Sequence, residues 1–155
     1  MNERLNRAGK VSLLFIAGLT LILAVNIMPG GARERAIDRL VLSGLYRLSE
    51  GEHVSDAIRT AHGRTMWVLP DSGDVIVRAE ARGYQSKLDL LVRLDAALEY
   101  RDFYLIAGNE GPHVTPRLRR GDLDALSGAS VTERAIRAAV TRIQRDLERT
   151  REESQ

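Results

Sequence analysis

The spacing of apolar residues changes from alternation in the middle of the chain to helical spacing on either side. Segments 75–81 and 88–94 alternate two sets of side chains, of which one set is wholly apolar, as in strands with a buried face. Segments 66–69 and 103–107 are shorter apolar runs that predict two further strands. Turn-forming residues such as those at 70–74 separate the runs. The pattern predicts an antiparallel β-meander.

Helical spacing predicts one amphipathic helix before this meander and one after it. Apolar side chains recur every three or four positions between residues 36 and 48, and again from Thr132 to Leu147. The second helix is expected to pack across the sheet, and the polar residues 149–155 are expected to fray. The first helix offers a face for core packing, for a partner or for a membrane surface. The soluble part is therefore predicted to be an α+β domain.

An apolar run without charges precedes this domain. Residues 11–28 read VSLLFIAGLTLILAVNIM, which is near the shortest length that crosses a hydrocarbon core about 30 Å thick. A cleaved signal peptide is the alternative, but the run is long for one and no small-x-small pair stands before Pro29. The basic residues of segment 1–10 favour a cytoplasmic N-terminus. We expect a basic segment at 1–10, a transmembrane helix at 11–28, a domain at 32–148 and a polar tail at 149–155.

Composition narrows the classes of function. The 23 basic and 21 acidic residues leave a net charge of +2, and only 5% of residues are aromatic, so nucleic-acid binding is not expected. The chain has no cysteine, which excludes thiolate catalysis and iron–sulfur ligation by its own residues. Its three histidines are scattered and lack the spacing of a metal site. Any redox group must therefore be held by other side chains.

The segment Asp124-Ala-Leu-Ser-Gly-Ala-Ser-Val-Thr132 brings an acid, small residues and hydroxyl groups to the start of the last helix. The unpaired N–H groups and the dipole at a helix N-terminus attract phosphate. Ser130 followed by Glu133 also has the pattern of a capping box, which would explain these two residues without any ligand.

This segment resembles the Asp-x-x-Ser-Gly-Ala-Thr-x-Thr flavinylation motif of FMN-binding domains in the RnfG and NqrC subunits of ion-pumping membrane redox complexes. Ser130 stands where that family usually has threonine. The resemblance continues upstream, in the family's order, through a single membrane helix, Gly83-Tyr84, the strand 88–95 and His113-Val-Thr-Pro116. This last loop lacks the glutamate directly before Thr-Pro and the glycine after it that are usual in the family.

The resemblance implies that FMN is attached through a phosphoester to Ser130, with Thr132 as the second candidate for attachment. It also implies that a flavin transferase of the ApbE type, which uses FAD and a divalent metal, modifies the chain. The other residues that the resemblance places near the flavin are Asp124, Ser127, Gly128, Ala129, Thr115 and Leu118.

The function that the resemblance implies is that of a membrane-anchored electron-transfer subunit of an Rnf-type ion-translocating ferredoxin:NAD oxidoreductase. Such a subunit crosses the bacterial inner membrane once, has its domain in the periplasm and works with other membrane and redox subunits. The chain has no dinucleotide fingerprint, so we do not expect it to be an enzyme alone. The alternatives are an NqrC-like subunit of a Na⁺-translocating quinone reductase, a structural subunit of the same fold without flavin, and an exported module that binds a small anion.

Overall fold

The computed structural model describes residues 30–121 and 130–153. The chain divides into two compact units, residues 1–38 and 39–155. The second unit contains the whole β-sheet of the protein's described part. The predicted transmembrane segment, residues 11–28, lies outside the described residues. Within the described ranges, no helix has both the length and the apolar character needed to cross a membrane.

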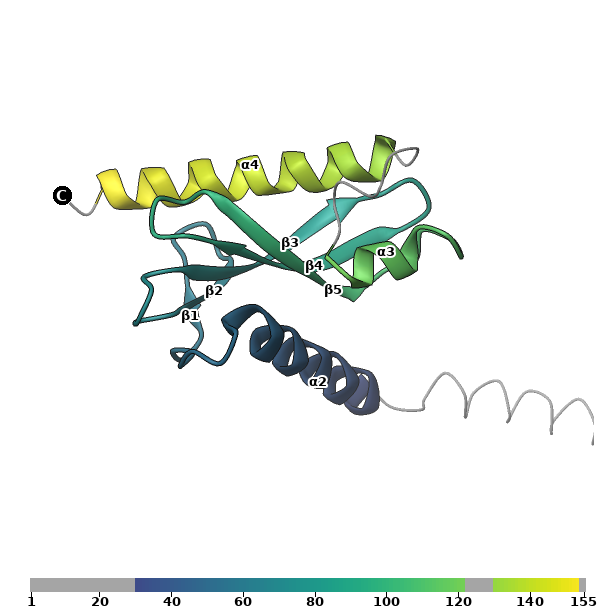
Figure 1. Cartoon of the computed structure of the whole chain (residues 1–155), viewed down its shortest axis with the longest axis horizontal. Helices are drawn as coiled ribbons and strands as arrows, with labels where there is room; N and C mark the ends of the chain where they lie inside the picture. Colours follow the sequence, from purple (N-terminus) through teal and green to yellow (C-terminus); the bar gives the residue numbers. More distant parts are fainter. Residues whose placement is uncertain (1–29, 122–129, 154–155) are drawn as a thin grey trace, which may run out of the picture. The chain divides into compact units, whose positions relative to one another are not determined.

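An antiparallel sheet of five strands forms the centre of the domain (Figure 1). In chain order, and in the same order across the sheet, the strands are β1 (Ile58–Arg59), β2 (Thr65–Val68), β3 (Val75–Arg82), β4 (Lys87–Leu94) and β5 (Tyr100–Ala107). The predicted meander is thus confirmed, with β2 to β5 in the places of the four predicted strands. The sequence did not reveal β1, because both of its residues are exposed and so give no alternation.

The main core lies between one face of this sheet and α4 (Ser130–Glu152), which runs along it (Figure 1). Alternate residues of β3, β4 and β5 point into this core, and α4 meets them with one apolar stripe. The helix residues of the core are Ile136, Ala139, Val140, Ile143 and Leu147. The predicted packing across the sheet is confirmed. The helix continues to Glu152 instead of fraying from Arg149, and Arg151 donates a hydrogen bond to the carbonyl of Ala96 there.

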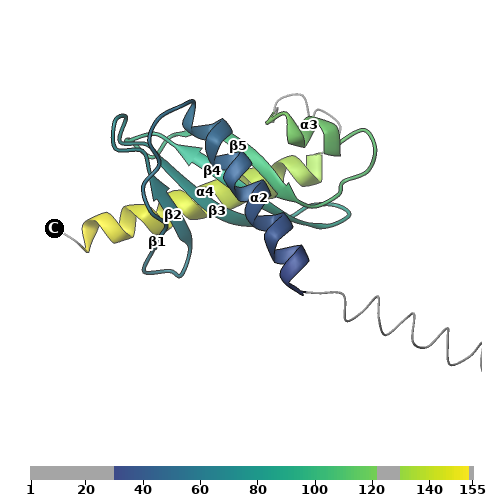
Figure 2. The ribbon, with the colours of Figure 1, turned by 90° about the horizontal axis from the view of Figure 1, so that it is seen from below.

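The opposite face of the sheet is covered by the part of α2 (Gly30–Ser49) that belongs to the same unit, from Arg39 onward (Figure 2). Leu45 and Leu48 of this helix are buried. Gly44 lies so close to the sheet that a Cβ atom built on it would be 2.7 Å from Leu91 Cδ1 and 2.6 Å from Tyr104 Cδ1. The absence of a side chain at Gly44 therefore sets how closely the helix approaches β4 and β5.

We expect Gly44→Ala to lower the free energy of unfolding. Alanine is favoured over glycine in a helix by about 1 kcal/mol, but a methyl group in this contact overpacks it at a cost of about 1–3 kcal/mol. Thermal unfolding of the full-length protein measures the net loss. Gly31→Ala is the control, because its Cβ would meet only the end of the Arg35 side chain at 3.6 Å. An unchanged melting temperature for Gly44→Ala would contradict the close approach.

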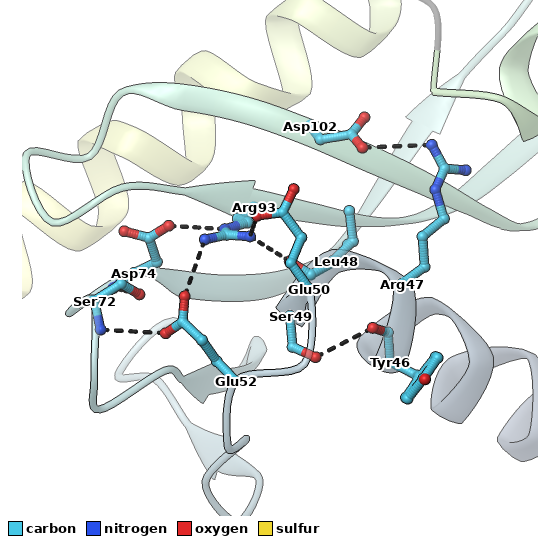
Figure 3. Close-up of polar contacts among 10 residues, drawn as sticks. All are labelled: Tyr46, Arg47, Leu48, Ser49, Glu50, Glu52, Ser72, Asp74, Arg93 and Asp102. Atoms are coloured by element: carbon cyan, nitrogen blue, oxygen red, sulfur yellow. Dashed lines mark hydrogen bonds and ion pairs between the residues drawn. The ribbon is translucent and has the colours of Figure 1, made fainter.

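A charged cluster ties the end of α2 to the sheet (Figure 3). The guanidinium group of Arg93 on β4, with 11% of its side chain exposed, donates to the Leu48 carbonyl at 2.6 Å and to Asp74 Oδ2 at 2.7 Å. It also pairs with Glu50 at 3.1 Å and Glu52 at 3.5 Å. A cation beside the last carbonyls of a helix is favourable, because those groups have no partner within the helix. We call these five residues the Arg93 cluster.

Candidate functional site

The structure describes only part of the predicted flavin site. Four of its residues lie outside the described ranges: Asp124, Ser127, Gly128 and Ala129. The helix α4 begins at Ser130, two residues earlier than predicted, and the side chain of Ser130 also lies outside what the structure describes. Thr115, Leu118 and Thr132 are described, and they can be placed in detail.

Three segments that are distant in the sequence meet at the carboxylate of Glu110. This residue follows β5, and only 6% of its surface is exposed. In the turn between β3 and β4, the N–H of Tyr84 donates to Oε2 at 2.8 Å and the N–H of Ser86 donates to Oε1 at 2.9 Å. The hydroxyl of Thr132, near the start of α4, donates to Oε2 at 2.6 Å. The carboxylate thus joins the β3–β4 turn, the loop after β5 and the first turn of α4.

Local sequence explains why the β3–β4 turn can surround a carboxylate. The turn is closed by the N–H of Gly83, which donates to the carbonyl of Ser86 at 2.9 Å. Gly83 has no side chain, and a Cβ atom there would overlap the Glu110 carboxylate. The N–H of Gln85 lies 3.2 Å from Oε1, so three successive N–H groups of the turn face the same charge. Successive amides of this kind form an anion-binding concavity, here filled by the protein's own carboxylate.

Thr115 supports the backbone of the same glutamate. The N–H of Glu110 donates to Thr115 Oγ1 at 2.8 Å, and this hydroxyl donates to Asn109 Oδ1 at 3.0 Å. Thr115 is the first residue of the short helix α3 (Thr115–Arg119). Pro116 follows it in the first turn, where the missing N–H of proline would have no partner within the helix. We call Glu110, Thr115, Thr132 and the turn amides of residues 84–86 the Glu110 site.

The helix α3 begins inside the loop His113-Val-Thr-Pro116 that the resemblance singled out. Leu118 of this helix is fully buried and belongs to the main core. Arg117, in the place where the family has glycine, is helical here. Leu118 therefore anchors α3 from inside the domain and presents no exposed surface.

Glu133, the predicted capping partner of Ser130, pairs with Arg137. Its Oε1 accepts a hydrogen bond from Arg137 Nε at 2.9 Å, one helical turn further along α4. This is a common way to stabilise the exposed face of a helix.

Hydrogen bonds keep Glu110 charged. Burial alone would raise the pKa of this carboxyl, but the Thr132 hydroxyl and the amides of Ser86, Tyr84 and Gln85 together outweigh it and hold the pKa below its usual value. The folded protein therefore contains a buried carboxylate whose charge is stabilised by these hydrogen-bond donors.

This lowered pKa predicts a specific dependence of stability on pH. A group with a lower pKa in the folded state stabilises the fold above its unfolded pKa, about 4.3 for glutamate, and loses that effect as the pH falls through the folded value. We expect Glu110→Gln to be less stable than the wild type near neutral pH, with a gap that narrows below about pH 4.3. Thermal unfolding of both proteins over a pH series measures this gap. Parallel curves for the two proteins would contradict the assignment.

The sequence alone did not single out Glu110 as a residue of the site. The family pattern has its glutamate directly before Thr-Pro, whereas Glu110 stands five positions before Thr115. Its neighbours, Asn109 and Gly111, are of residue types that are common in loops. An acid between a strand and a Thr-Pro pair was the available signal, but a polar loop residue is exposed far more often than buried.

A cleft of about 530 Å³ lies at the β3–β4 turn. It is lined by residues 80–87 of the two strands and their turn and by Arg142 of α4. Small-molecule sites have volumes of about 300–1,000 Å³, so the cleft is large enough for one. Its lining includes Tyr84 and the cationic side chains of Arg82 and Arg142, which suit an aromatic and anionic ligand. Lys87 of the same lining is paired with Glu80 at 2.7 Å. Among the described residues, no group of histidine, aspartate and glutamate side chains could hold a metal ion.

Comparisons of the chain with models of protein families, with curated proteins and with solved structures found no match. The resemblance to RnfG and NqrC subunits therefore stays a prediction from the motif.

Proposed function

We propose that this protein is a membrane-anchored electron-transfer subunit that carries FMN as a phosphoester on Ser130, in an Rnf-type ion-translocating ferredoxin:NAD oxidoreductase complex. The main support is the convergence at Glu110. Segments that the resemblance singled out separately meet at this one residue: Tyr84 and Thr132 donate to its buried carboxylate, and Thr115 accepts a hydrogen bond from its backbone N–H. A capping box alone would give no reason for these segments to meet.

The described residues near the motif fit a flavin phosphate. The helix α4 has 23 residues and begins at Ser130, so its first N–H groups are available to an anion at that position. The β3–β4 turn whose amides bind Glu110 also lines the cleft that contains Arg82 and Arg142. FMN would supply the ability to pass electrons singly or in pairs. The chain would contribute a permanent attachment point and a rigid frame for it.

In this proposal the segment 11–28 anchors the domain in the bacterial inner membrane with the domain in the periplasm. The other subunits of the complex would handle NAD and ferredoxin, since the chain has no dinucleotide fingerprint and no cysteine. An NqrC-like role in a Na⁺-translocating quinone reductase would use the same site. A structural subunit without flavin is the competing proposal, and serine instead of threonine at position 130 favours it.

Flavin fluorescence in a denaturing gel tests the proposal. The protein is purified from its own host, denatured and separated, so that only covalently bound flavin remains with the chain. We expect a fluorescent band at the mass of the protein. Protein made in cells without the flavin transferase is the control and should give no fluorescence. A dark band from the native host would favour the structural subunit.

A further inference from the structure

We propose that Glu110 and Thr132 form a latch that fixes the start of α4 and thereby directs flavinylation to Ser130 and away from Thr132. This inference rests on the proposed function. It assigns Glu110 and Thr132 as positioning residues and distinguishes the two hydroxyl groups that the motif offers to the transferase.

The hydroxyl of Thr132 is enclosed by the protein. Only 1% of the residue's surface is exposed. Its Oγ1 donates to Glu110 Oε2 at 2.6 Å and accepts a hydrogen bond from the N–H of Tyr84 at 3.3 Å. A carboxylate at this distance could take the proton of a nucleophilic hydroxyl. The burial leaves FAD no approach to that oxygen, so the contact holds the threonine in place instead of activating it.

Glu110, the other member of the latch, is held in place by several hydrogen bonds. Glu110 accepts hydrogen bonds from the amides of Tyr84 and Ser86, and its own N–H donates to Thr115. These partners belong to the β3–β4 turn and to the start of α3. The carboxylate therefore has a fixed position, and it fixes the first turn of α4 through Thr132.

The two candidate hydroxyl groups belong to different positions in the first turn of α4. Residues two positions apart on a helix do not share a face. Thr132 faces Glu110, and position 130 is the first residue of the same helix, two residues earlier. In the reaction we propose, Ser130 Oγ forms a bond to the FMN phosphorus of FAD and the bond to AMP breaks. AMP leaves, and the hydroxyl proton goes to a base of the transferase. A precise angle of attack needs a fixed helix start.

The experiment measures the rate of flavin transfer to full-length protein made without the transferase. Purified transferase, FAD and Mg²⁺ are added, and peptide mapping locates the flavin. We expect Thr132→Val to slow modification about tenfold to a hundredfold, as misplaced reacting groups do. Thr132→Ser keeps the hydroxyl and should be modified at a rate near that of the wild type.

A core variant separates positioning from loss of stability. Ile143 is fully buried in the main core, and Ile143→Val should lower the melting temperature without slowing modification of the folded protein. Modification of Thr132→Val at the wild-type rate would overturn the latch and leave the proposed function standing. Flavin found on Thr132 of the wild type would also overturn it. Wild-type protein that accepts no flavin would overturn the proposed function together with the latch.

Discussion

Replacement of Ser130 by alanine is expected to abolish covalent flavin while leaving the domain folded. The substitution removes the oxygen that would form the phosphoester. The core contacts of α4 come from residues further along the helix, such as Ile136 and Ile143, and they do not depend on this hydroxyl. If Ser130 also caps the helix, the loss of the cap lowers the free energy of unfolding by about 1 kcal/mol. Intact mass and thermal unfolding of the same preparation measure the two effects.

Ser130→Thr is the matched control for this prediction. It supplies the hydroxyl that the RnfG and NqrC subunits use, so flavin should be retained. A Ser130→Ala protein that still carries flavin would contradict the assignment of the attachment residue. If the flavin were then found on Thr132, the enclosure of that hydroxyl by Glu110 would have to be reversible.

The second large effect is expected at Arg93. Arg93→Ala should lower the free energy of unfolding by about 3–5 kcal/mol, because removal of one member of a buried ion pair leaves the other charge without compensation. The group left behind is Asp74, whose side chain is 10% exposed. Burial alone lowers the pKa of Arg93, but Asp74 and Glu50 outweigh it and hold the pKa above its usual value, so the guanidinium stays charged. Thermal unfolding of the full-length protein checks the prediction.

An exposed ion pair provides the comparison. Lys87 and Glu80 approach to 2.7 Å, but their side chains are 68% and 62% exposed. Exposed pairs of this kind contribute about 0–1 kcal/mol, so Lys87→Ala should change stability little. In a double variant, Arg93→Met with Asp74→Asn, both charges are gone, and stability should partly return. If Arg93→Ala cost no more than Lys87→Ala, the Arg93 cluster would not be what holds the end of α2 to the sheet.

The elements that the sequence predicted well are those with a long buried face. Strands β3 and β4 each have eight residues, enough for alternation to show, and the apolar stripe of α4 repeats over several turns. The short elements β1 and α3 have two and five residues. Both residues of β1 are exposed and α3 has one buried residue, Leu118, so neither element repeats a buried position and no periodic pattern could reveal it.

The candidate site shows a similar limit. Thr115, Thr132 and Gly83-Tyr84 could each be singled out from local motifs. Their meeting at Glu110 could not be predicted, because the hydrogen bonds to this residue join positions up to 26 apart in the sequence. Burial of an acidic loop residue is a consequence of how the sheet, α3 and α4 pack together. The Arg93 cluster could not be predicted for the same reason, since its charges come from the segment after α2, the β2–β3 turn and β4.

The mass of the intact protein, purified from its own host and followed by peptide mapping across residues 124–134, tests the central claim most directly. The account predicts an added mass equal to one esterified FMN, located on Ser130. A peptide of unmodified mass at full sequence coverage would contradict it.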